Sequence, residues 1–136
     1  MSSDVSWLDK SGMKFRQLIP MLRTWQMDAS IAFYTEVLGF RCESSREGWA
    51  ALRRDDVEIM LSQRNSHAGG TAPAFTGSLY IEVQDVDALW LELKDKAQVC
   101  YPLEQFDYGM REFCIYDNNG YLIQFGQEVA ISEAAS

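Results

Sequence analysis

The stretch of sequence that decides the fold is residues 22–40, LRTWQMDASIAFYTEVLGF. Its first residues continue an apolar run, and we predict a buried strand over Phe15–Trp25. Asp28 then stands where a helix can be capped, and Gly39 gives the signal for the helix end before Phe40 begins the next strand. The helix between them carries one apolar stripe at spacings of four and three, made of Met27, Ile31, Tyr34 and Leu38.

The order of elements after this helix predicts a repeat. Gly48–Arg53 and Val57–Gln63 alternate as two short strands, joined by the polar turn Arg54-Asp55-Asp56. The second half repeats the pattern of strand, helix and three strands, expected at Ser78–Val83, Val86–Ala97, Val99–Tyr101, Arg111–Tyr116 and Tyr121–Phe125. Shifting the first half by 59 positions lays Met27 on Val86, and shifting it by 64 lays Ile59 on Ile123.

Each half is therefore predicted to be one βαβββ unit, which gives an α+β fold of two modules with curved mixed sheets and the helices outside. A sheet that covers only one face with a helix leaves its other face to a second sheet or a second copy of the chain. The breaker-rich segment after the first unit, with Gly69-Gly70 and Pro73, is the expected linker. The predicted boundaries are an arm at 1–13, modules at 14–64 and 76–127, a linker at 65–75 and a flexible tail at 128–136.

Composition excludes several classes of partner. The chain has 136 residues, a net charge of −8 and 47% apolar residues, which is the balance of one globular domain that would repel phosphate backbones and anionic lipids. We expect neither a nucleic-acid nor a membrane partner, because no apolar run reaches the roughly 20 residues of a membrane span. The three scattered cysteines, with no signal peptide ahead of them, predict a reduced, cytoplasmic setting.

Two blocks of sequence resemble a known family. Phe33-Tyr34 with Leu38-Gly39-Phe40, and the closing turn Asp117-Asn118-Asn119-Gly120, look like signatures of the vicinal oxygen chelate superfamily, which includes glyoxalase I, extradiol dioxygenases and bleomycin resistance proteins. Asn118 stands where proline is usual. Gly48-Trp49 and the turn at Arg53–Asp56 are most similar to the bleomycin resistance branch. The resemblance implies a homodimer with two clefts between sheets.

The enzymes of this superfamily hold a divalent metal with His, Glu or Gln side chains, and that resemblance identifies the positions to inspect. Carried over residue by residue, they fall on Ile19 (or Pro20 with a register slip), Met60, Ser78 and Gln124. Only Gln124 offers even a weak donor to a hard metal, so we expect no metal and no cofactor. His67, the single histidine, lies in the linker, and we expect Glu58, Glu82 and Glu112 on the other face of their strands.

The expected ligand surface is aromatic, since aromatic walls suit planar or amphipathic guests. Strand neighbours alternate, so one of Arg111 and Glu112 should face the cavity, and Arg111 could instead pair with a carboxylate. Trp90, on the helical stripe, and Cys114 are expected in the core. The candidate cleft residues are Trp25, Trp49, Met60, Ser78, Tyr80, Phe106, Tyr108, Met110, Arg111 and Gln124.

These features favour a metal-free small-molecule binding protein that sequesters an amphipathic, aromatic and possibly cationic, antibiotic-like ligand in a dimer cleft, without catalytic residues. The alternative is a glyoxalase-like lyase or isomerase, or a dioxygenase relative, whose metal is held by atypical ligands such as Glu58, Glu112 and Gln124. A third hypothesis is an interaction module whose cleft is filled by its own Met60, Met110 and Phe113. The identity of the ligand lies beyond what the residues predict.

Overall fold

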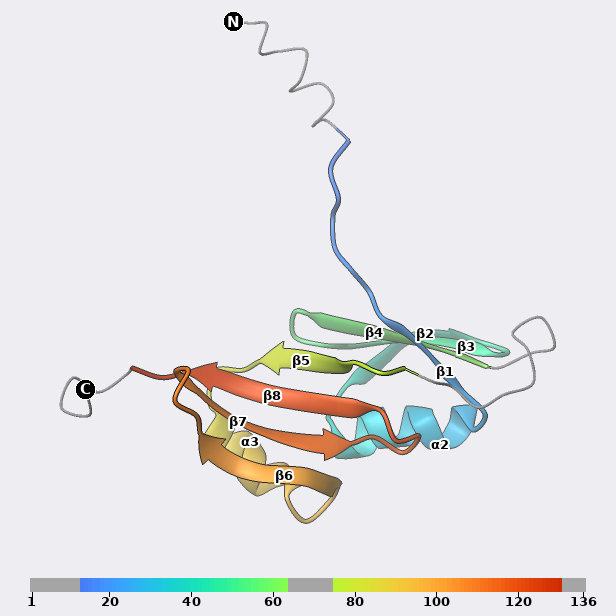
Figure 1. Ribbon diagram of the computed structural model, residues 1–136. Helices are drawn as coiled ribbons and strands as arrows, with labels where there is room; N and C mark the ends of the chain where they lie inside the picture. The colour runs from blue at the N-terminus through green and yellow to red at the C-terminus, as the bar shows by residue number, and fades with distance from the viewer. Residues whose placement is uncertain (1–12, 64–74, 131–136) are drawn as a thin grey trace, which may run out of the picture.

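Two four-stranded sheets follow one another along the chain in the computed structural model, which describes residues 13–63 and 75–130. The first unit consists of β1 (Met21–Thr24), α2 (Met27–Ala32), the π-helical turn η1 (Phe33–Val37), β2 (Arg41–Arg46), β3 (Trp49–Arg54) and β4 (Val57–Gln63). The second consists of β5 (Ser78–Glu82), α3 (Val86–Leu93), β6 (Gln98–Gln105), β7 (Met110–Tyr116) and β8 (Leu122–Glu128). Figure 1 shows both helices on the same side of the strands.

The strand order confirms the predicted repeat. The sheets run β1-β4-β3-β2 and β5-β8-β7-β6, each with one parallel pair and two antiparallel pairs. Met21 of β1 lies opposite Met60 of β4, and Tyr80 of β5 lies opposite Gln124 of β8. Tyr80 is 59 positions after Met21, and Gln124 is 64 positions after Met60, so the two sequence offsets describe the same strand register.

Alternation along the strands divides each sheet into a helix-facing and an open face. Leu22, Ile59 and Leu61 are buried in the shared core, together with Ile123 and Phe125 of the second unit. Their neighbours in sequence point to the opposite face of the sheet, which no helix covers. Trp90 packs edge-on against Phe113 at 5.1 Å in the core, as predicted. Cys114 is also buried, as predicted, but on the other face of β7.

The first helix differs from the prediction at its start and agrees with it at its end. Gln26 precedes α2 without a side-chain cap, so Asp28 lies in the first turn and is not the capping residue. The α-helix continues as η1 to Val37, and Gly39 follows with φ +74°, the left-handed conformation expected of a glycine at a helix end. In the second unit Asp85 does cap α3, accepting a 3.1 Å hydrogen bond from the amide of Ala88.

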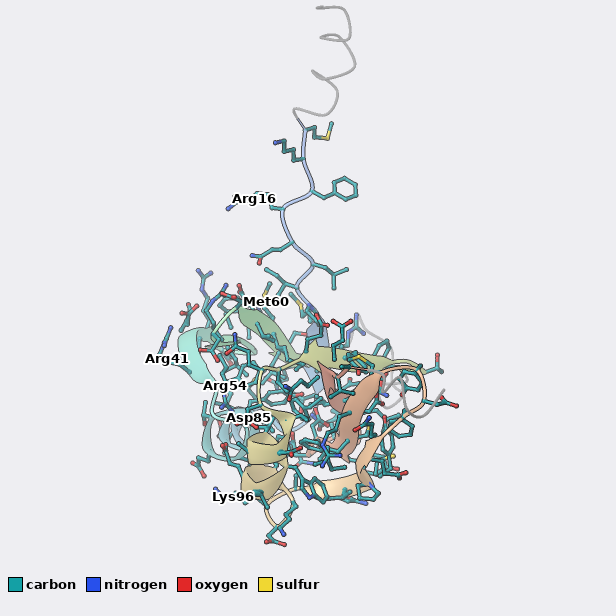
Figure 2. All side chains as sticks on the ribbon, turned by 90° about the vertical axis from the view of Figure 1, so that its left-hand side faces the viewer. Arg16, Arg41, Arg54, Met60, Asp85 and Lys96 are labelled. Atoms are coloured by element: carbon teal, nitrogen blue, oxygen red, sulfur yellow. The ribbon has the colours of Figure 1, made fainter. Side chains whose placement is uncertain are left out.

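Two strand predictions were wrong in length. The predicted strand Phe15–Trp25 is a strand only at Met21–Thr24, where it pairs with β4, and within residues 13–63 and 75–130 no strand pairs with the residues before Met21. Figure 2 shows this segment, with Arg16, leaving the body on the side where Met60 lies. Conversely, β6 continues to Gln105 through two register shifts and includes Pro102, which a strand at the edge of a sheet tolerates.

Several predictions concern residues outside the described part of the chain. Most of the arm at 1–13 and of the linker at 65–75, with His67, falls there, as does most of the tail at 128–136. Within residues 13–63 and 75–130, no helix has the length and apolar character needed to cross a membrane.

Candidate functional site

A buried carboxylate marks the open face of the second sheet. Glu112 of β7 is 1% exposed, although no arginine or lysine pairs with it in the described residues. Cys114 lies opposite Gln124, and Gln124 lies opposite Tyr80, so these residues share the face of Glu112. A buried carboxylate is costly unless hydrogen bonds compensate for the lost water.

Three tyrosines and a glutamine supply those hydrogen bonds. The Tyr80 hydroxyl donates to Oε1 of Glu112 at 2.8 Å, the Tyr101 hydroxyl donates to Oε2, and Tyr108 also hydrogen-bonds the carboxylate. Nε2 of Gln124 lies 3.3 Å from Oε2. We refer to Tyr80, Tyr101 and Tyr108 around Glu112 as the tyrosine cage. It gathers side chains from β5, β6, β7 and the turn between β6 and β7.

The cage keeps a negative charge within the fold. Burial raises the pKa of Glu112, but the hydrogen bonds from the three tyrosines and Gln124 outweigh burial and hold the pKa below its usual value. Burial and the neighbouring Glu112 raise the pKa values of Tyr80 and Tyr101. Near neutral pH the site therefore holds one carboxylate and protonated phenols that donate to it.

Gln124 is held by its own partners. Its side-chain oxygen accepts a 2.5 Å hydrogen bond from Ser78, and its nitrogen donates to the Tyr101 hydroxyl at 2.7 Å. The two predicted positions Ser78 and Gln124 thus lie together, and hydrogen bonds connect them to Glu112. The amide orients the cage rather than presenting a free oxygen to solvent.

Gly126 makes room for Tyr80. A Cβ atom on Gly126 would lie 2.0 Å from the Tyr80 hydroxyl oxygen, far closer than atoms can approach. Gly126 is opposite both Glu112 and Glu82 in the register, so Tyr80 crosses β8 at this glycine to reach Glu112. A side chain at this position would exclude Tyr80 from the cage.

Aromatic rings form the outer part of the site. Phe106 stacks on Tyr108 with 5.3 Å between ring centroids, and its edge meets Tyr101 at 6.0 Å. Tyr80 is 43% and Tyr108 59% exposed, whereas Glu112 beneath them is buried. The arrangement offers exposed ring surface above a negative charge, and such surfaces attract organic cations.

The open face of the first sheet carries a second group of predicted residues. The Trp49 indole nitrogen donates to the Met60 sulfur at 3.2 Å, and Arg53 forms a 2.7 Å ion pair with Glu58. Trp49 and Met60 belong to β3 and β4 of the first sheet, whereas the cage belongs to the second. The predicted cleft residues therefore form two groups within one chain.

The donor set does not fit a metal. The family positions present a hydrocarbon side chain at Ile19, a soft thioether at Met60, and a hydroxyl and an amide that bond each other at Ser78 and Gln124. Among residues 13–63 and 75–130, no group of three or more His, Cys, Asp or Glu side chains could hold a metal ion. The atypical ligand set is also dispersed, since Glu58 is on the first sheet and Glu112 is on the second.

Trp25 lies apart from both groups. It lines a cavity of about 530 Å³ between the start of α2 and the hairpin that joins β2 to β3. Met27, Arg46 and Gln63 contribute to the same wall, and Arg46 also lies 5.7 Å above the ring of Trp49. None of the cage residues lines this cavity, so it is separate from the tyrosine cage.

Arg111 and Glu112 lie on opposite faces of β7, as the predicted alternation requires. Arg111 forms a 2.6 Å ion pair with Asp87 at the start of α3, which is the alternative to ligand contact that the sequence offered, so it does not belong to the tyrosine cage. The prediction for the strand carboxylates was wrong. These carboxylates lie on the open faces, because side chains two residues apart on a strand share a face. Glu58 is two residues before Met60, and Glu82 is two residues after Tyr80. Glu112 is two residues before Cys114, which lies opposite Gln124.

Other predicted residues divide between the faces. Met110 is two residues before Glu112 on β7 and shares its face. Phe113 is fully buried against Trp90 and Phe125, so it does not fill the cleft as the third hypothesis supposed. Sequence reasoning missed Glu112 as the centre of the site and did not include Tyr101 or Gly126. Alternation at Arg111 and Glu112 was the one signal that could have found the carboxylate.

The fold and this site define a class: a chain of two βαβββ units whose open sheet faces carry the candidate ligand residues. The model of the Glyoxalase/Bleomycin resistance protein/Dioxygenase superfamily matches residues 17–125, and the chain belongs to that superfamily. A bleomycin resistance protein from Geobacillus stearothermophilus is 28% identical over 129 residues, covering 83% of this chain and 97% of the relative.

Solved structures agree on the architecture. A protein of unknown function from Agrobacterium tumefaciens superposes with a TM-score of 0.74 at 21% identity, over 86% of this chain and 97% of that one. The bleomycin-binding protein of Streptomyces verticillus, solved with copper(II)-bleomycin, superposes with a TM-score of 0.63 at 25% identity, over 87% and 98%. The expected α+β fold and the resemblance to the bleomycin resistance branch are thereby confirmed.

Proposed function

We propose that the protein binds a small amphipathic molecule that carries an aromatic group and a positive charge, and that the tyrosine cage receives the charged end. The observation that carries this proposal is Glu112, a carboxylate held ionised beneath exposed rings of Tyr80 and Tyr108. A cation over these rings is attracted both by the ring faces and by the carboxylate below. Binding is proposed to sequester the ligand without chemical change.

The named relatives support a drug-like ligand. The Geobacillus relative is called a bleomycin resistance protein, and the Streptomyces neighbour was solved with copper(II)-bleomycin. We therefore place bleomycin-type antibiotics first among ligands to test, with resistance to such a compound as the cellular role. Identity of 28% or less does not carry the ligand itself from one chain to another.

We also propose that binding needs no metal held by this protein. Met60 accepts a hydrogen bond from Trp49, while Ser78 and Gln124 bond each other, so these positions already have partners. A soft sulfur, a hydroxyl and an amide form a poor set for a hard divalent ion. The charge of the site then remains negative, which suits a cationic guest.

A second copy of the chain is proposed to complete the cleft. Met13, Phe15 and Leu18 in the segment before β1 are 81%, 99% and 87% exposed, and this segment extends away from the body (Figure 2). A run of exposed apolar side chains is unfavourable in water unless another surface covers it. A homodimer would cover these side chains and would bring another open sheet face over the cage.

The charge requirement can be tested with two probes that share one ring system. Isothermal titration with 1-naphthylmethylammonium and with neutral 1-naphthylmethanol compares a cation with its uncharged counterpart. We expect the ammonium to bind about tenfold more tightly to the natural protein, which corresponds to about 1.4 kcal/mol. For Glu112→Gln, which keeps the shape but loses the charge, we expect the two affinities to agree within about twofold.

Controls separate binding from folding. Glu58→Gln removes a carboxylate on the other sheet and should leave the preference for the cation unchanged. The circular dichroism spectrum of each variant reports whether it has folded. Equal affinities of the natural protein for the two probes would contradict the proposal. Titration with bleomycin then tests whether this drug is a ligand. If the ammonium binds and bleomycin does not, the bleomycin assignment is wrong, whereas the proposal of a cation-binding site is supported.

A further inference from the structure

Two cysteines on neighbouring strands lie beside the tyrosine cage. Cys100 is exposed on β6 and Cys114 is buried on β7, and both are free thiols. The register passes from Val99 opposite Ile115 to Tyr101 opposite Cys114, which leaves Cys100 as an extra residue in a β-bulge. Cys100 nevertheless lies close enough to Cys114 to raise the pKa of the Cys114 thiol.

The bulge brings Cys100 across from Cys114, as a disulfide between the two strands requires. In a bulge, two residues of one strand lie opposite one residue of its partner, and Cys100 directly precedes Tyr101, which is opposite Cys114. Disulfides join residues whose Cα atoms are roughly 4.4–6.8 Å apart, which includes the separation of about 4.5–5.5 Å between opposed residues of antiparallel strands. Cys100 has no partner of its own in the register, so its backbone can adjust without breaking a ladder pair.

Because Cys100 is exposed and Cys114 is buried, we expect the two thiols to have different roles in an oxidation. Burial and, to a smaller extent, the neighbouring Cys100 raise the pKa of the Cys114 thiol to about 12, so Cys114 is protonated and unreactive at neutral pH. Cys100 is exposed and can meet a dissolved oxidant. Oxidation of Cys100 replaces its thiol, which removes one of the influences that keeps Cys114 protonated.

We propose that Cys100 and Cys114 form a reversible redox site, in which hydrogen peroxide converts the two thiols to a disulfide that alters the tyrosine cage. The Cys100 sulfur attacks one peroxide oxygen, which gives a sulfenic acid and one molecule of water. The Cys114 sulfur then displaces the hydroxyl group, which leaves with the Cys114 proton as a second molecule of water. Two electrons pass from the sulfurs to the peroxide, and a dithiol reductant reverses the reaction.

The disulfide is coupled to the cage through Tyr101, the residue directly after Cys100. The Tyr101 hydroxyl donates to Glu112 and accepts from Gln124, so it is the member of the cage bonded to both. Drawing Cys100 toward Cys114 shifts the backbone at Tyr101 and weakens these hydrogen bonds. Any effect on ligand affinity rests on the function proposed above, whereas the disulfide and the change at Tyr101 do not.

The test treats the whole reduced protein with hydrogen peroxide and maps its disulfides by mass spectrometry. The natural chain has three cysteines, and we expect one intramolecular Cys100–Cys114 bridge, a loss of two hydrogens and one remaining free thiol. Cys42, exposed on β2 of the other sheet, provides the control: Cys42→Ser should form the same bridge and retain no free thiol. Cys100→Ser and Cys114→Ala should not form it.

Two outcomes would overturn the inference. Stable sulfenic or sulfinic acid at Cys100, or a bridge between chains as the main product, would show that Cys114 does not resolve the oxidised thiol. If the bridge forms but the near-ultraviolet tyrosine circular dichroism is the same before and after oxidation, the coupling to the cage is wrong. This optical measurement needs no ligand, so it stays informative even if the naphthyl probes do not bind. Dithiothreitol should restore the original spectrum.

Discussion

The hydroxyl of Tyr34 donates a 2.7 Å hydrogen bond to Oδ2 of Asp117, joining residues 83 positions apart in the two units. Tyr34 belongs to η1 of the first unit and is fully buried, and Asp117 opens the turn after β7 of the second. Asp117 also accepts from the amides of Asn119 and Tyr121, which fixes the turn. The two sequence blocks that identify the family therefore meet in space and hold the units together.

Ser30 of α2 lies beside this contact and extends it. Its hydroxyl accepts from the side-chain amides of Asn118 and Asn119, both at 3.0 Å, and hydrogen-bonds Thr24 at 2.7 Å. Asn118 stands where the family usually has proline, and proline has no side-chain donor. In this chain the departure from the family pattern thus adds a contact between the units.

Replacing Tyr34 by phenylalanine should destabilise the protein by about 1–3 kcal/mol, because a buried carboxylate loses a donor while the ring still fills its place. Burial raises the pKa of Asp117, and the Tyr34 hydrogen bond opposes that rise. The loss should therefore be larger at pH 7 than at pH 4, where Asp117 becomes protonated more readily. Urea unfolding at both pH values measures it. Equal losses would contradict the account. The control Thr35→Val removes a hydroxyl of η1 that donates to the carbonyl of Ile31, and it is not expected to show this pH dependence.

The fold could be predicted from local patterns because its two units repeat the same spacing. The stripe from Met27 to Leu38 and the glycine at 39 mark the helix, and the offsets of 59 and 64 describe the register of β1 with β4 and of β5 with β8. The strand before Met21 could not be predicted correctly. An apolar run predicts a buried strand, but burial requires a second surface that covers it. The pattern of one sequence does not identify whether that surface belongs to the same chain.

The site was less predictable for a different reason. Aromatic and polar candidates such as Tyr80, Tyr108 and Gln124 could be selected by residue type, but their common partner Glu112 was predicted only as one of two strand neighbours that could face the cavity or as an atypical metal ligand. Its burial depends on contacts from four segments of the chain. The close approach of Tyr80 to Gly126 is equally non-local, since it joins residues of two parallel strands.

Cation binding should depend on pH through Glu112. The hydrogen bonds of the cage hold its pKa below the ordinary value of 4.5 despite burial. The affinity for 1-naphthylmethylammonium should therefore be constant from pH 8 to pH 5 and fall only below that. The same shift stabilises the fold above the unfolded pKa of about 4.5 and is lost as pH falls through the lower folded pKa. A fall in affinity centred near pH 6 would point to another group, and Glu112→Gln should give a flat profile.

Gly126→Ala tests the path of Tyr80. Because a Cβ atom would lie 2.0 Å from the Tyr80 hydroxyl oxygen, the ring must leave the cage and Glu112 must lose a donor. We expect a loss of about 1–3 kcal/mol in stability and a rise in the pKa of Glu112. Nuclear magnetic resonance of the carboxyl carbon follows that pKa. The matched variant Tyr80→Phe removes the same hydrogen bond without crowding, and the two should raise the pKa in the same direction; an unchanged value in both would contradict the role of Tyr80.

Metal retention distinguishes sequestration from the lyase alternative. After incubation with Zn, Ni, Mn or Fe ions and removal of the excess, we expect well below one metal per chain, since Met60 and Gln124 already have hydrogen-bond partners. Ser78→His combined with Gln124→Glu places two metal donors at positions that contact each other on one sheet, and this variant should retain more metal than the natural protein. One equivalent bound by the natural protein would mean that other residues form a centre, and would favour the lyase.

The segment before β1 gives the most direct test of the proposed dimer. Phe15 is 99% and Leu18 is 87% exposed, and each side chain should contribute about 1.5–3 kcal/mol when a second copy buries it. Replacing both by serine should therefore shift the protein from dimer to monomer in sedimentation equilibrium at micromolar concentration. Arg16 lies between them on the same segment, so Arg16→Ser is the control for a polar change there and should leave the dimer intact (Figure 2). If the natural protein sediments as a monomer, the cage is open to solvent in the working form and the two-chain cleft is wrong. If the double variant stays dimeric, the contact between copies lies elsewhere, and the open sheet faces themselves become the surface to mutate.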